Sequence, residues 1–351
     1  MSKIPEPTQS IQALIDSYHE KKAEPPRPHM GASQLGHQCD RYLWLSFRWS
    51  VQEKFPGRIL RLFRRGQNEE ATIISDLRAI GLDVRGTING NQARVDFGGH
   101  VSGSLDAIIE SGVPEAPKKR HIAEFKTHSL KSFNELEKVG VEKAKFQHYI
   151  QMQVYMHGTE IDRALYLAVC KDDDRIYTER VRYDKVIAEK YIDRGKRIAL
   201  ADRLPEPLPG GSASWYECKF CPAYDFCWGT KQTKQVNCRT CAHATAKEDS
   251  TWRCERHDAD DIPIDFQRTG CDCNVLHPDL VPWKLDQTAS NQWDAVFIID
   301  GKPVRNGEPD AYVFSSREIL ANPSACANPD ELTSELRKEF GARIVEFEET
   351  V

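Results

Sequence analysis

The sequence lacks the long apolar run of a membrane span, because no stretch approaches the roughly 20 residues that cross a bilayer. Its first residues, MSKIPEPTQS, lack the charged and then apolar pattern of a secretory signal peptide. Among 351 residues there are only 11 cysteines, too few for a secreted disulfide scaffold. We therefore expect a cytoplasmic protein with no membrane partner, and its length allows about two domains.

An excess of positive charge is also missing, because 48 basic and 53 acidic residues give a formal net charge of -5. The charge is uneven, since residues 286–351 carry 13 acidic and 6 basic side chains, whereas residues 41–65 carry seven basic residues and one acid. Aromatic residues interrupt that basic stretch, as in grooves that hold phosphates and stack bases. We predict DNA contacts there, with a solvated helix face as the alternative. The expected DNA-binding residues are Arg58, Arg61, Arg64 and Arg65.

The spacing of apolar residues predicts an α/β protein. Helical spacing over residues 33–47 and 55–81 predicts two helices that precede any strand, and short alternating segments over 83–110 predict an antiparallel meander with a turn at Asn89-Gly90. A strand, a helical zone, a hairpin and a helix are expected next, over residues 121–129, 132–157, 163–183 and 185–201. His148 and His157 are expected on the surface of the helical zone.

Composition divides the chain into four expected parts. Residues 1–30 form a helix and a proline-containing linker, and residues 31–232 form the main core. Residues 233–285 are rich in cysteine, and residues 286–351 form an acidic C-terminal segment.

Two acidic residues and one lysine carry the most informative chemistry. Glu124 and Lys126 are two residues apart on an expected strand, so their side chains point to the same face. Asp106 is on a neighbouring expected strand, and a cluster of carboxylate oxygens suits Mg²⁺ or Mn²⁺. Such a cation neutralises charge on a phosphodiester, while Lys126 assists the attacking water. The alternative for an isolated E-x-K step is a surface strand with alternating charge.

The order of these residues resembles the PD-(D/E)XK nuclease superfamily, in particular its RecB-like branch and the CRISPR-associated adaptation exonucleases. The resemblance implies that Asp106 and Glu124 bind the metal ion, that Lys126 is catalytic, and that Gln151 and Tyr155 form a Q-x3-Y helix beside the site. It also implies a restriction-endonuclease-like core, in which helices flank a central mixed sheet.

The helix before the meander departs from the pattern of that family. The family often has a histidine in this motif, where the present chain has Gly66-Gln67-Asn68-Glu69-Glu70. We choose Glu70 as the additional metal ligand, and Glu69 and His100 stay open as alternatives.

A first cysteine set combines Cys218-x2-Cys221-x5-Cys227 with the distant Cys39. This arrangement resembles the iron-sulfur nucleases of the RecB-like branch, in which a 4Fe-4S cluster joins the N-terminal helix to the C-terminal end of the core. The resemblance implies a 4Fe-4S cluster at these four residues. Zinc is the alternative, because four thiolates bind either group.

A second cysteine set predicts a small zinc module. Cys238-x2-Cys241 is followed by Cys254 and Cys271, and these four thiols are the expected Zn²⁺ ligands. Cys273 competes with Cys271 for the fourth place. A module of about 50 residues has too small a core to be stable alone, so the metal would supply much of its folding energy.

These features together predict a metal-dependent DNA nuclease, an exonuclease that acts on single-stranded or duplex DNA ends in recombination or repair. A phage origin and a recombination protein as partner are further expectations. The alternative is a DNA-binding recombination accessory protein that has the nuclease fold and does not cleave. A third hypothesis is a zinc-centred adaptor.

Overall fold

A computed structural model describes residues 10–86 and 92–344 of the chain, so the turn expected at Asn89-Gly90 lies outside the described residues. The chain forms two compact units with interleaved sequence. The first unit contains Met1–His37, Glu53–Phe97 and Val101–Gly195, and the second contains Gln38–Gln52, Gly98–His100 and Lys196–Val351. None of the described helices has both the length and the apolarity needed to cross a membrane. The four domain boundaries expected from composition stay a prediction.

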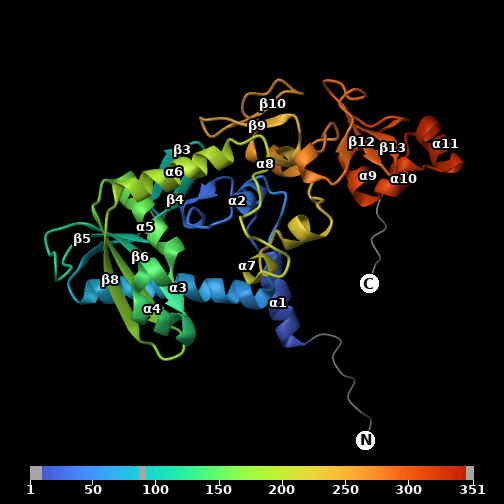
Figure 1. Ribbon diagram of the computed structural model, residues 1–351. Helices are drawn as coiled ribbons and strands as arrows, with labels where there is room; N and C mark the ends of the chain where they lie inside the picture. Colours follow the sequence, from blue (N-terminus) through green and yellow to red (C-terminus); the bar gives the residue numbers. More distant parts are fainter. Residues whose placement is uncertain (1–9, 87–91, 345–351) are drawn as a thin grey trace, which may run out of the picture. The chain divides into compact units, whose positions relative to one another are not determined.

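The first unit is built on a five-stranded mixed sheet with the strand order β2-β5-β6-β7-β8 (Figure 1). Strands β6 and β7 are parallel, and the other neighbouring pairs are antiparallel. The expected strand and hairpin are present as β6, β7 and β8. The bounds are β2 (Asp83–Arg85), β5 (Ala107–Ser111), β6 (His121–His128), β7 (Arg163–Cys170) and β8 (Ile176–Arg182).

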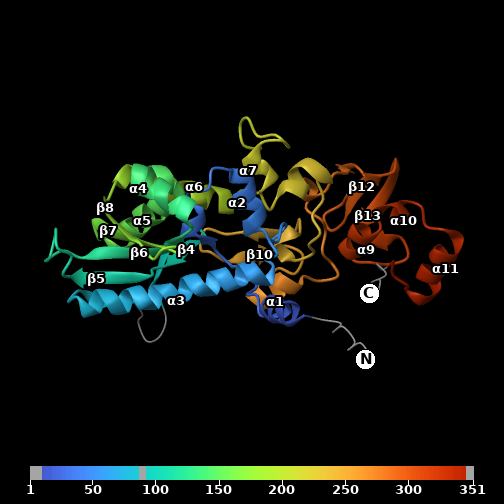
Figure 2. The ribbon, with the colours of Figure 1, turned by 90° about the horizontal axis from the view of Figure 1, so that it is seen from below.

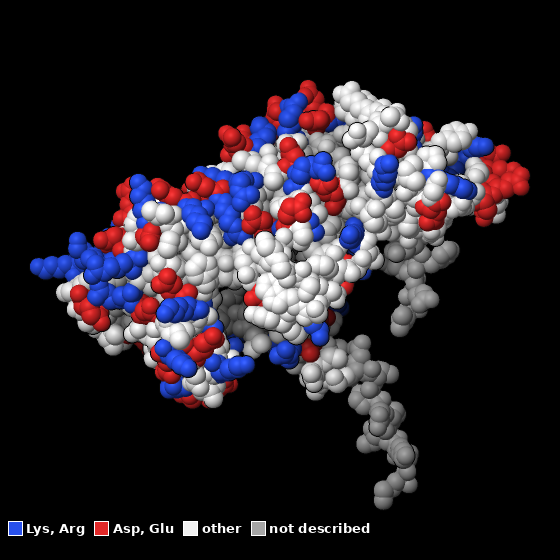
Figure 3. Space-filling model, in the orientation of Figure 1, with Lys and Arg blue, Asp and Glu red and all other residues white. Residues whose placement is uncertain are grey.

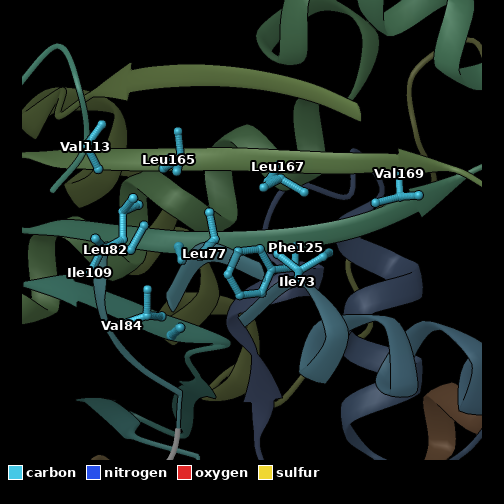
Figure 4. Close-up of a cluster of buried hydrophobic side chains, with 12 residues drawn as sticks. Ile73, Leu77, Leu82, Val84, Ile109, Val113, Phe125, Leu165, Leu167 and Val169 are labelled. Atoms are coloured by element: carbon cyan, nitrogen blue, oxygen red, sulfur yellow. The ribbon is translucent and has the colours of Figure 1, made fainter. Parts of the chain in front are cut away.

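Helix α3 (Gly57–Ala79) covers one face of this sheet and confirms the helix expected over residues 55–81. Its buried Ile73 and Leu77 pack against Phe125 of β6 and Leu167 of β7 (Figure 4). The contact between α3 and the sheet removes water from both surfaces, which favours apolar side chains there. The α3 face therefore forms the apolar core of the unit.

Helices α4 (Leu130–Ala144) and α5 (Phe146–Thr159) lie on the opposite side of the sheet from α3 (Figure 2). The expected single helical zone is divided between them, because Gly140 has a φ of 78° and Lys145 is not helical. Gly140 adopts this left-handed conformation without the clash of a Cβ atom. The break allows α5 to lie across β6 and β7 with eight of its residues buried.

The expected meander over residues 83–110 is wrong as a single sheet. Strand β2 pairs with β5, whereas the two strands between them belong to a separate three-stranded sheet with the order β1-β4-β3. Its strands are β1 (Met30–Gly31), β3 (Arg94–Gly98) and β4 (Val101–Ser104). The two-residue β1 pairs in parallel with β4, so a strand precedes α3, contrary to the expected order. Asp106 follows β4 directly and precedes β5, at the point where the chain passes from one sheet to the other.

Several short helical elements complete the two units. Helix α1 (Ile11–Lys21) and the 3-10 turn η1 (Ala32–Gln34) belong to the first unit, and α2 (Asp40–Phe47) belongs to the second. The helix expected over residues 33–47 is therefore replaced by η1 and α2. Helix α6 (Lys185–Ala199) confirms the helix expected over 185–201.

The second unit has little regular structure around its cysteines and a folded C-terminal part. That part is a four-stranded sheet, order β11-β12-β13-β14, with its own core around Phe297, Val304, Phe314 and Ile319. Its elements are β11 (Lys284–Leu285), β12 (Ala295–Ile299), β13 (Lys302–Asn306), β14 (Val313–Phe314), α9 (Ser316–Ala321), α10 (Pro323–Ala327) and α11 (Glu331–Phe340). The cysteine-rich part contains α7 (Tyr216–Lys219), η2 (Asp225–Gly229), η3 (Cys238–Thr240), β9 (Ala244–Ala246), β10 (Trp252–Cys254), α8 (Ile264–Thr269) and η4 (Pro278–Leu280).

Candidate active site

Glu124 and Lys126 of β6 form the centre of the candidate site. Ala123 and Phe125 point into the α3 core, so the alternation of the strand turns Glu124 and Lys126 toward the side of α4 and α5. The side chain of Glu124 is completely buried, and Lys126 forms an ion pair with it. The E-x-K step is therefore an internal pair on the sheet, and the alternative of an exposed strand does not apply to Glu124.

Asp106 joins this pair from the junction between β4 and β5. Its carboxylate Oδ2 lies 3.7 Å from Nζ of Lys126 and accepts a hydrogen bond of 2.9 Å from the backbone N–H of Phe125. That backbone bond holds Asp106 beside the middle of β6. The structure thus brings Asp106, Glu124 and Lys126 together.

Glu70 reaches the same group from α3. The pKa of Glu70 is raised to about 7, mainly by burial and also by the negative charge of Asp106, while Lys126 opposes the shift. Burial also raises the pKa of Glu124 to about 8, and among its neighbours Lys126 lowers this pKa while Asp106 and Glu70 raise it. Three carboxyl groups therefore share one ammonium, which leaves the cluster with excess negative charge when all are ionised.

Lys126 balances part of this negative charge. Burial lowers the pKa of Lys126, but Glu124 and Asp106 raise it, and the pKa is raised overall. Its ammonium is thus held in the protonated form between two carboxylates. Apart from its contact with Lys126, the carboxylate of Glu124 has no hydrogen-bond partner among the described residues. A buried carboxylate in this condition suits an added cation, because burying a charge is costly unless it is paired and hydrogen-bonded.

Gln151 and Tyr155 lie on α5 and are both buried. The hydroxyl of Tyr155 donates a hydrogen bond of 2.7 Å to the backbone carbonyl of Ser104, two residues before Asp106, and Gln151 also hydrogen-bonds to Tyr155. A Cβ atom at Gly103 would lie 2.5 Å from the Tyr155 hydroxyl oxygen, so only glycine permits this approach. The two residues therefore tie α5 to the strand that leads to Asp106.

Sequence reasoning missed three polar residues next to this site. Tyr166 is the register partner of Glu124 on β7, and its hydroxyl contacts His128 and His148. The prediction that His148 and His157 are surface residues is wrong, because each is partly buried and bonded to a tyrosine hydroxyl. The placement of His148 three residues before Gln151 is the pattern that could have indicated it.

The expected DNA-binding arginines lie in the first turns of α3. Arg61 forms an ion pair with Asp16 of α1, Arg65 donates to the carbonyl of Lys171, and Arg64 lies 3.5 Å from His19. Arg58 is exposed. Figure 3 shows Lys and Arg side chains mixed with acidic ones over the face that it presents. The arginine assignment stays a prediction.

Two of the aromatic residues expected to stack bases are not available for stacking. Phe47 and Trp49 are buried in the second unit, with 4% and 2% of their surface exposed. The guanidinium carbon of Arg239 lies 3.8 Å from the ring centroid of Trp49, which makes this ring part of the packing of the unit. The stretch over residues 41–65 is therefore divided: residues up to Gln52 belong to the second unit, and the residues from Glu53 lead into α3 in the first unit.

The four thiols of the first cysteine set belong to the second unit. The negative charges of Cys39, Cys218 and Cys227 all contribute to the raised pKa of Cys221, of which burial is the main cause, so the four lie close to one another. Arg41 donates a side-chain hydrogen bond to Cys227.

The second cysteine set lines one cavity of about 320 Å³. Burial raises the pKa of Cys238 to about 12, with Cys271 and Cys254 as the next causes. The sulfur of Cys241 accepts backbone hydrogen bonds from His243 at 3.5 Å and Val275 at 3.4 Å. Its pKa is affected by both Cys271 and Cys238.

Cys273 lines the same cavity and contributes to the raised pKa of Cys271. Burial is the main cause of the raised pKa of Cys273 itself, and Glu308 and Arg256 also affect it. In the described residues, no group of three or more His, Cys, Asp or Glu side chains already has the arrangement that holds a metal ion. The metal-binding roles of both cysteine sets, and those of Glu70, Asp106 and Glu124, therefore stay predictions.

Comparisons with known proteins gave only distant structural similarity. No family model matches the sequence, and no curated protein matches it. The crystal structure of SSO0001 is similar with a TM-score of 0.40 and 16% identity over 62% of this chain and 98% of that one. LHK-Exo, an alkaline exonuclease from Laribacter hongkongensis solved in complex with dAMP, matches with a TM-score of 0.35 and 13% identity over 53% of this chain and 89% of that one.

A phage-related exonuclease from Haemophilus somnus 129PT matches with a TM-score of 0.28 and 20% identity, over 39% of this chain and 68% of that chain. The chain is thus distantly similar to alkaline and phage exonucleases. Its mixed sheet flanked by helices confirms the expected α/β class, and the nuclease-type core with its metal groups stays a prediction.

Proposed function

We propose that this chain is a metal-dependent deoxyribonuclease that hydrolyses phosphodiester bonds at the site formed by Asp106, Glu124 and Lys126. The observation that supports this most directly is the buried Glu124, whose carboxylate has Lys126 as its one partner among the described residues, while Asp106 and Glu70 share that lysine. A protein gains nothing for stability from such a cluster unless another charge enters it.

The donor set fits a hard divalent cation. Carboxylate oxygens are the ligands that Mg²⁺ and Mn²⁺ prefer, and Glu70, Asp106 and Glu124 would hold the ion. When bound, such a cation lowers the pKa of water and neutralises charge on a phosphodiester. This assignment includes Glu70, whose pKa responds to Asp106 and Lys126.

The side chains of the chain itself supply orientation and proton handling. Lys126 keeps its proton next to Glu124 and Asp106, so it donates hydrogen bonds to the attacking water or to the non-bridging phosphate oxygens, where negative charge develops. Gln151 and Tyr155 keep α5 against the strand before Asp106 and position the scissile strand. In this proposal Tyr155 stays neutral, because burial raises its pKa.

The substrate we propose is the end of a DNA chain, single-stranded or duplex, processed in recombination or repair. Arg58 and Arg64 at the start of α3 would contact the phosphates, with Arg61 and Arg65 released from their internal partners. The proposal therefore includes a salt-dependent affinity for DNA.

We further propose a metal group at each cysteine set. Cys39, Cys218, Cys221 and Cys227 would hold a 4Fe-4S cluster, and Cys238, Cys241, Cys254 and Cys271 would hold Zn²⁺. Mutual electrostatic influence within each set supports both assignments. Cys273 stays the alternative to Cys271 for the fourth place, because it influences the pKa of Cys271 and the two thiols line the same cavity. Metal analysis of protein prepared without oxygen should find about four irons and one zinc per chain.

The decisive experiment measures degradation of end-labelled DNA by protein prepared without oxygen. We expect cleavage with Mg²⁺ or Mn²⁺, none with a chelator, and a loss of at least about a hundredfold in Lys126→Ala. Lys138→Ala, a change at an exposed lysine of α4, is the matched control and should cleave normally. Full activity of Lys126→Ala, or no cleavage by the wild type with either cation, would refute the proposal.

A further inference from the structure

A hydrogen-bonded cluster of two histidines and one tyrosine lies beside the candidate active site and has no role in the chemistry described above. Tyr166 is completely buried on β7, opposite Glu124 in register. Its hydroxyl oxygen lies 2.8 Å from Nε2 of His128 and 2.9 Å from Nδ1 of His148. The two imidazole rings stack with their centroids 5.8 Å apart. Three polar side chains are thus held in one arrangement next to the E-x-K strand.

His148 lies on the same face of α5 as the two residues already assigned to the site. Positions 148, 151 and 155 are separated by three and four residues, which places them along one helix face. Gln151 and Tyr155 are buried, whereas His148 is half-buried. Tyr166 engages Nδ1 of His148, and the described residues make no hydrogen bond to Nε2. Nε2 is therefore the atom on this face that a ligand can reach.

The surroundings keep both imidazoles neutral. The pKa of His148 is lowered to about 2, mainly by burial, with Lys126, His128 and Lys145 as additional causes. Burial also lowers the pKa of His128 to about 4, with Lys145, Lys171 and Lys126 as additional causes. A neutral imidazole has one N–H donor and one acceptor nitrogen, so the partner of one nitrogen decides what the other does.

A continuous chain of hydrogen bonds allows Nε2 of His148 to be a donor. Ser132 Oγ lies 3.3 Å from Nδ1 of His128. When Ser132 donates to Nδ1, the proton of His128 lies on Nε2, His128 donates to the Tyr166 hydroxyl, and Tyr166 donates to Nδ1 of His148. In the reverse direction Nε2 would be an acceptor, and a bound phosphate, whose oxygens accept, would select the first direction.

We propose that His148 binds a phosphate group of the DNA substrate through its Nε2–H, beside Lys126, and that Tyr166 is the positioning residue that holds its tautomer. This inference rests on the proposed function, because it assigns a substrate contact within the same site. His148 provides a directed hydrogen bond and stays uncharged, whereas Lys126 provides the charge. The combination binds phosphate without adding a second buried cation to the site.

The experiment compares four variants for binding of a fluorescent DNA duplex in Ca²⁺, by anisotropy, and for cleavage in Mg²⁺. His148→Ala should weaken binding roughly tenfold to a hundredfold, the effect of losing a hydrogen bond to a charged group. His148→Gln, whose amide offers an N–H near the position of Nε2, should stay within about threefold of the wild type. Tyr166→Phe should show an intermediate loss.

His157 provides a matched control on the same helix. Its Nδ1 lies 2.8 Å from the Tyr183 hydroxyl, so it forms the same kind of pair in the last turn of α5. His157→Ala should bind and cleave DNA as the wild type does. Equal losses in His148→Ala and His157→Ala, or unchanged binding in His148→Ala, would overturn the inference.

Failure of the inference is distinguishable from failure of the proposed function. A wild-type protein that cleaves DNA while His148→Ala behaves like His157→Ala keeps the proposed function and removes the inference. If the wild type binds DNA without cleaving it, and His148→Ala binds more weakly, the inference is kept and the proposed function is removed. Thermal unfolding shows whether His148→Ala folds. If it does not, His148→Asn replaces it, because its amide reaches only the Nδ1 position, and the same losses are expected.

Discussion

The two faces of strand β6 differ in a way that separates stability from chemistry. On the α3 face, Ala123 and Phe125 join a cluster that contains only apolar side chains. On the α5 face, Glu124 is completely buried and Lys126 is partly buried, yet both carry charge, and the neighbouring strand adds the Tyr166 hydroxyl. One strand thus contributes a core to one side and a reactive cluster to the other.

This difference agrees with the binding role that the proposed function gives to the polar face. Buried apolar area stabilises the fold by roughly 25 cal/mol per Å², whereas a buried, incompletely paired carboxylate opposes folding. The apolar burial on the α3 face therefore offsets the unfavourable free energy of burying Glu124 on the α5 face. The predictions below alter one face at a time.

The largest effect on stability is expected on the apolar face. Phe125→Ala removes a ring that is 1% exposed and should lower the free energy of unfolding by about 3–5 kcal/mol, because it leaves a cavity among Ile73, Leu77 and Leu167. Urea unfolding measures this value. Ile80→Ala, at a residue that is 74% exposed, is the control and should change little. A loss below about 1 kcal/mol in Phe125→Ala would contradict the assignment of the core.

The next effect concerns the polar face and depends on pH. The folded protein holds Glu124 with a pKa of about 8 and Glu70 with a pKa of about 7, both above the ordinary value of 4.5. At pH values between 4.5 and 8 the folded state therefore retains protons that the unfolded chain has released. The contribution of these two groups to the free energy of unfolding of the metal-free protein should therefore be most favourable below about pH 4.5. It should fall as the pH rises to about 8.

Glu124→Gln tests that relation. The neutral amide removes the largest titrating contribution, so the metal-free variant should gain about 2–4 kcal/mol relative to the wild type at pH 8 and nothing at pH 4. Addition of Mg²⁺ or Mn²⁺ at pH 8 should stabilise the wild type and leave Glu124→Gln nearly unchanged. Thermal unfolding at both pH values measures the difference. An equal gain at pH 4 and pH 8 would show that Glu124 does not titrate as described.

A smaller effect is expected where α5 meets the strand before Asp106. Gly103→Ala would place its Cβ 2.5 Å from the Tyr155 hydroxyl oxygen and 2.8 Å from the Cβ of Ala32, so it should cost about 1–3 kcal/mol. It should also lower DNA cleavage, because Tyr155 must shift from Ser104. The double variant with Tyr155→Phe, which removes the closest atom, should recover part of the stability. No recovery would assign the clash to Ala32 alone.

The sequence predicted those parts of the site that depend on local periodicity. A period of two places Glu124 and Lys126 on one face, and helical spacing places Gln151 and Tyr155 on another, so both pairs were predictable from neighbouring residues. Both pairs lie close to Asp106 only because the strands of residues 83–111 are divided between two sheets. No local sequence pattern indicates that division. For the same reason the antiparallel meander was predicted wrongly.

Long-range contacts explain the other differences. Residues 38–52 join the second unit through partners far along the chain, such as the indole N–H of Trp44, which donates to the carbonyl of Ala201. The partnership of His148 with Tyr166 likewise joins a helix to a strand 18 residues away. A histidine on an amphipathic helix is compatible with either face, so the sequence alone left its environment undetermined.

The smallest predicted effect tests whether the α3 helix can be changed without disturbing the site on the other face of the sheet. Gly66 lies inside α3, and a Cβ there would meet only the Thr127 hydroxyl oxygen at 3.9 Å, an ordinary contact. Gly66→Ala should therefore raise the free energy of unfolding by about 0.5–1 kcal/mol, because alanine loses less backbone entropy in a helix. Chemical denaturation measures the gain, and DNA cleavage should be unchanged, since Glu70 remains one turn away. A loss of cleavage with increased stability would show that the two faces of β6 are coupled through α3.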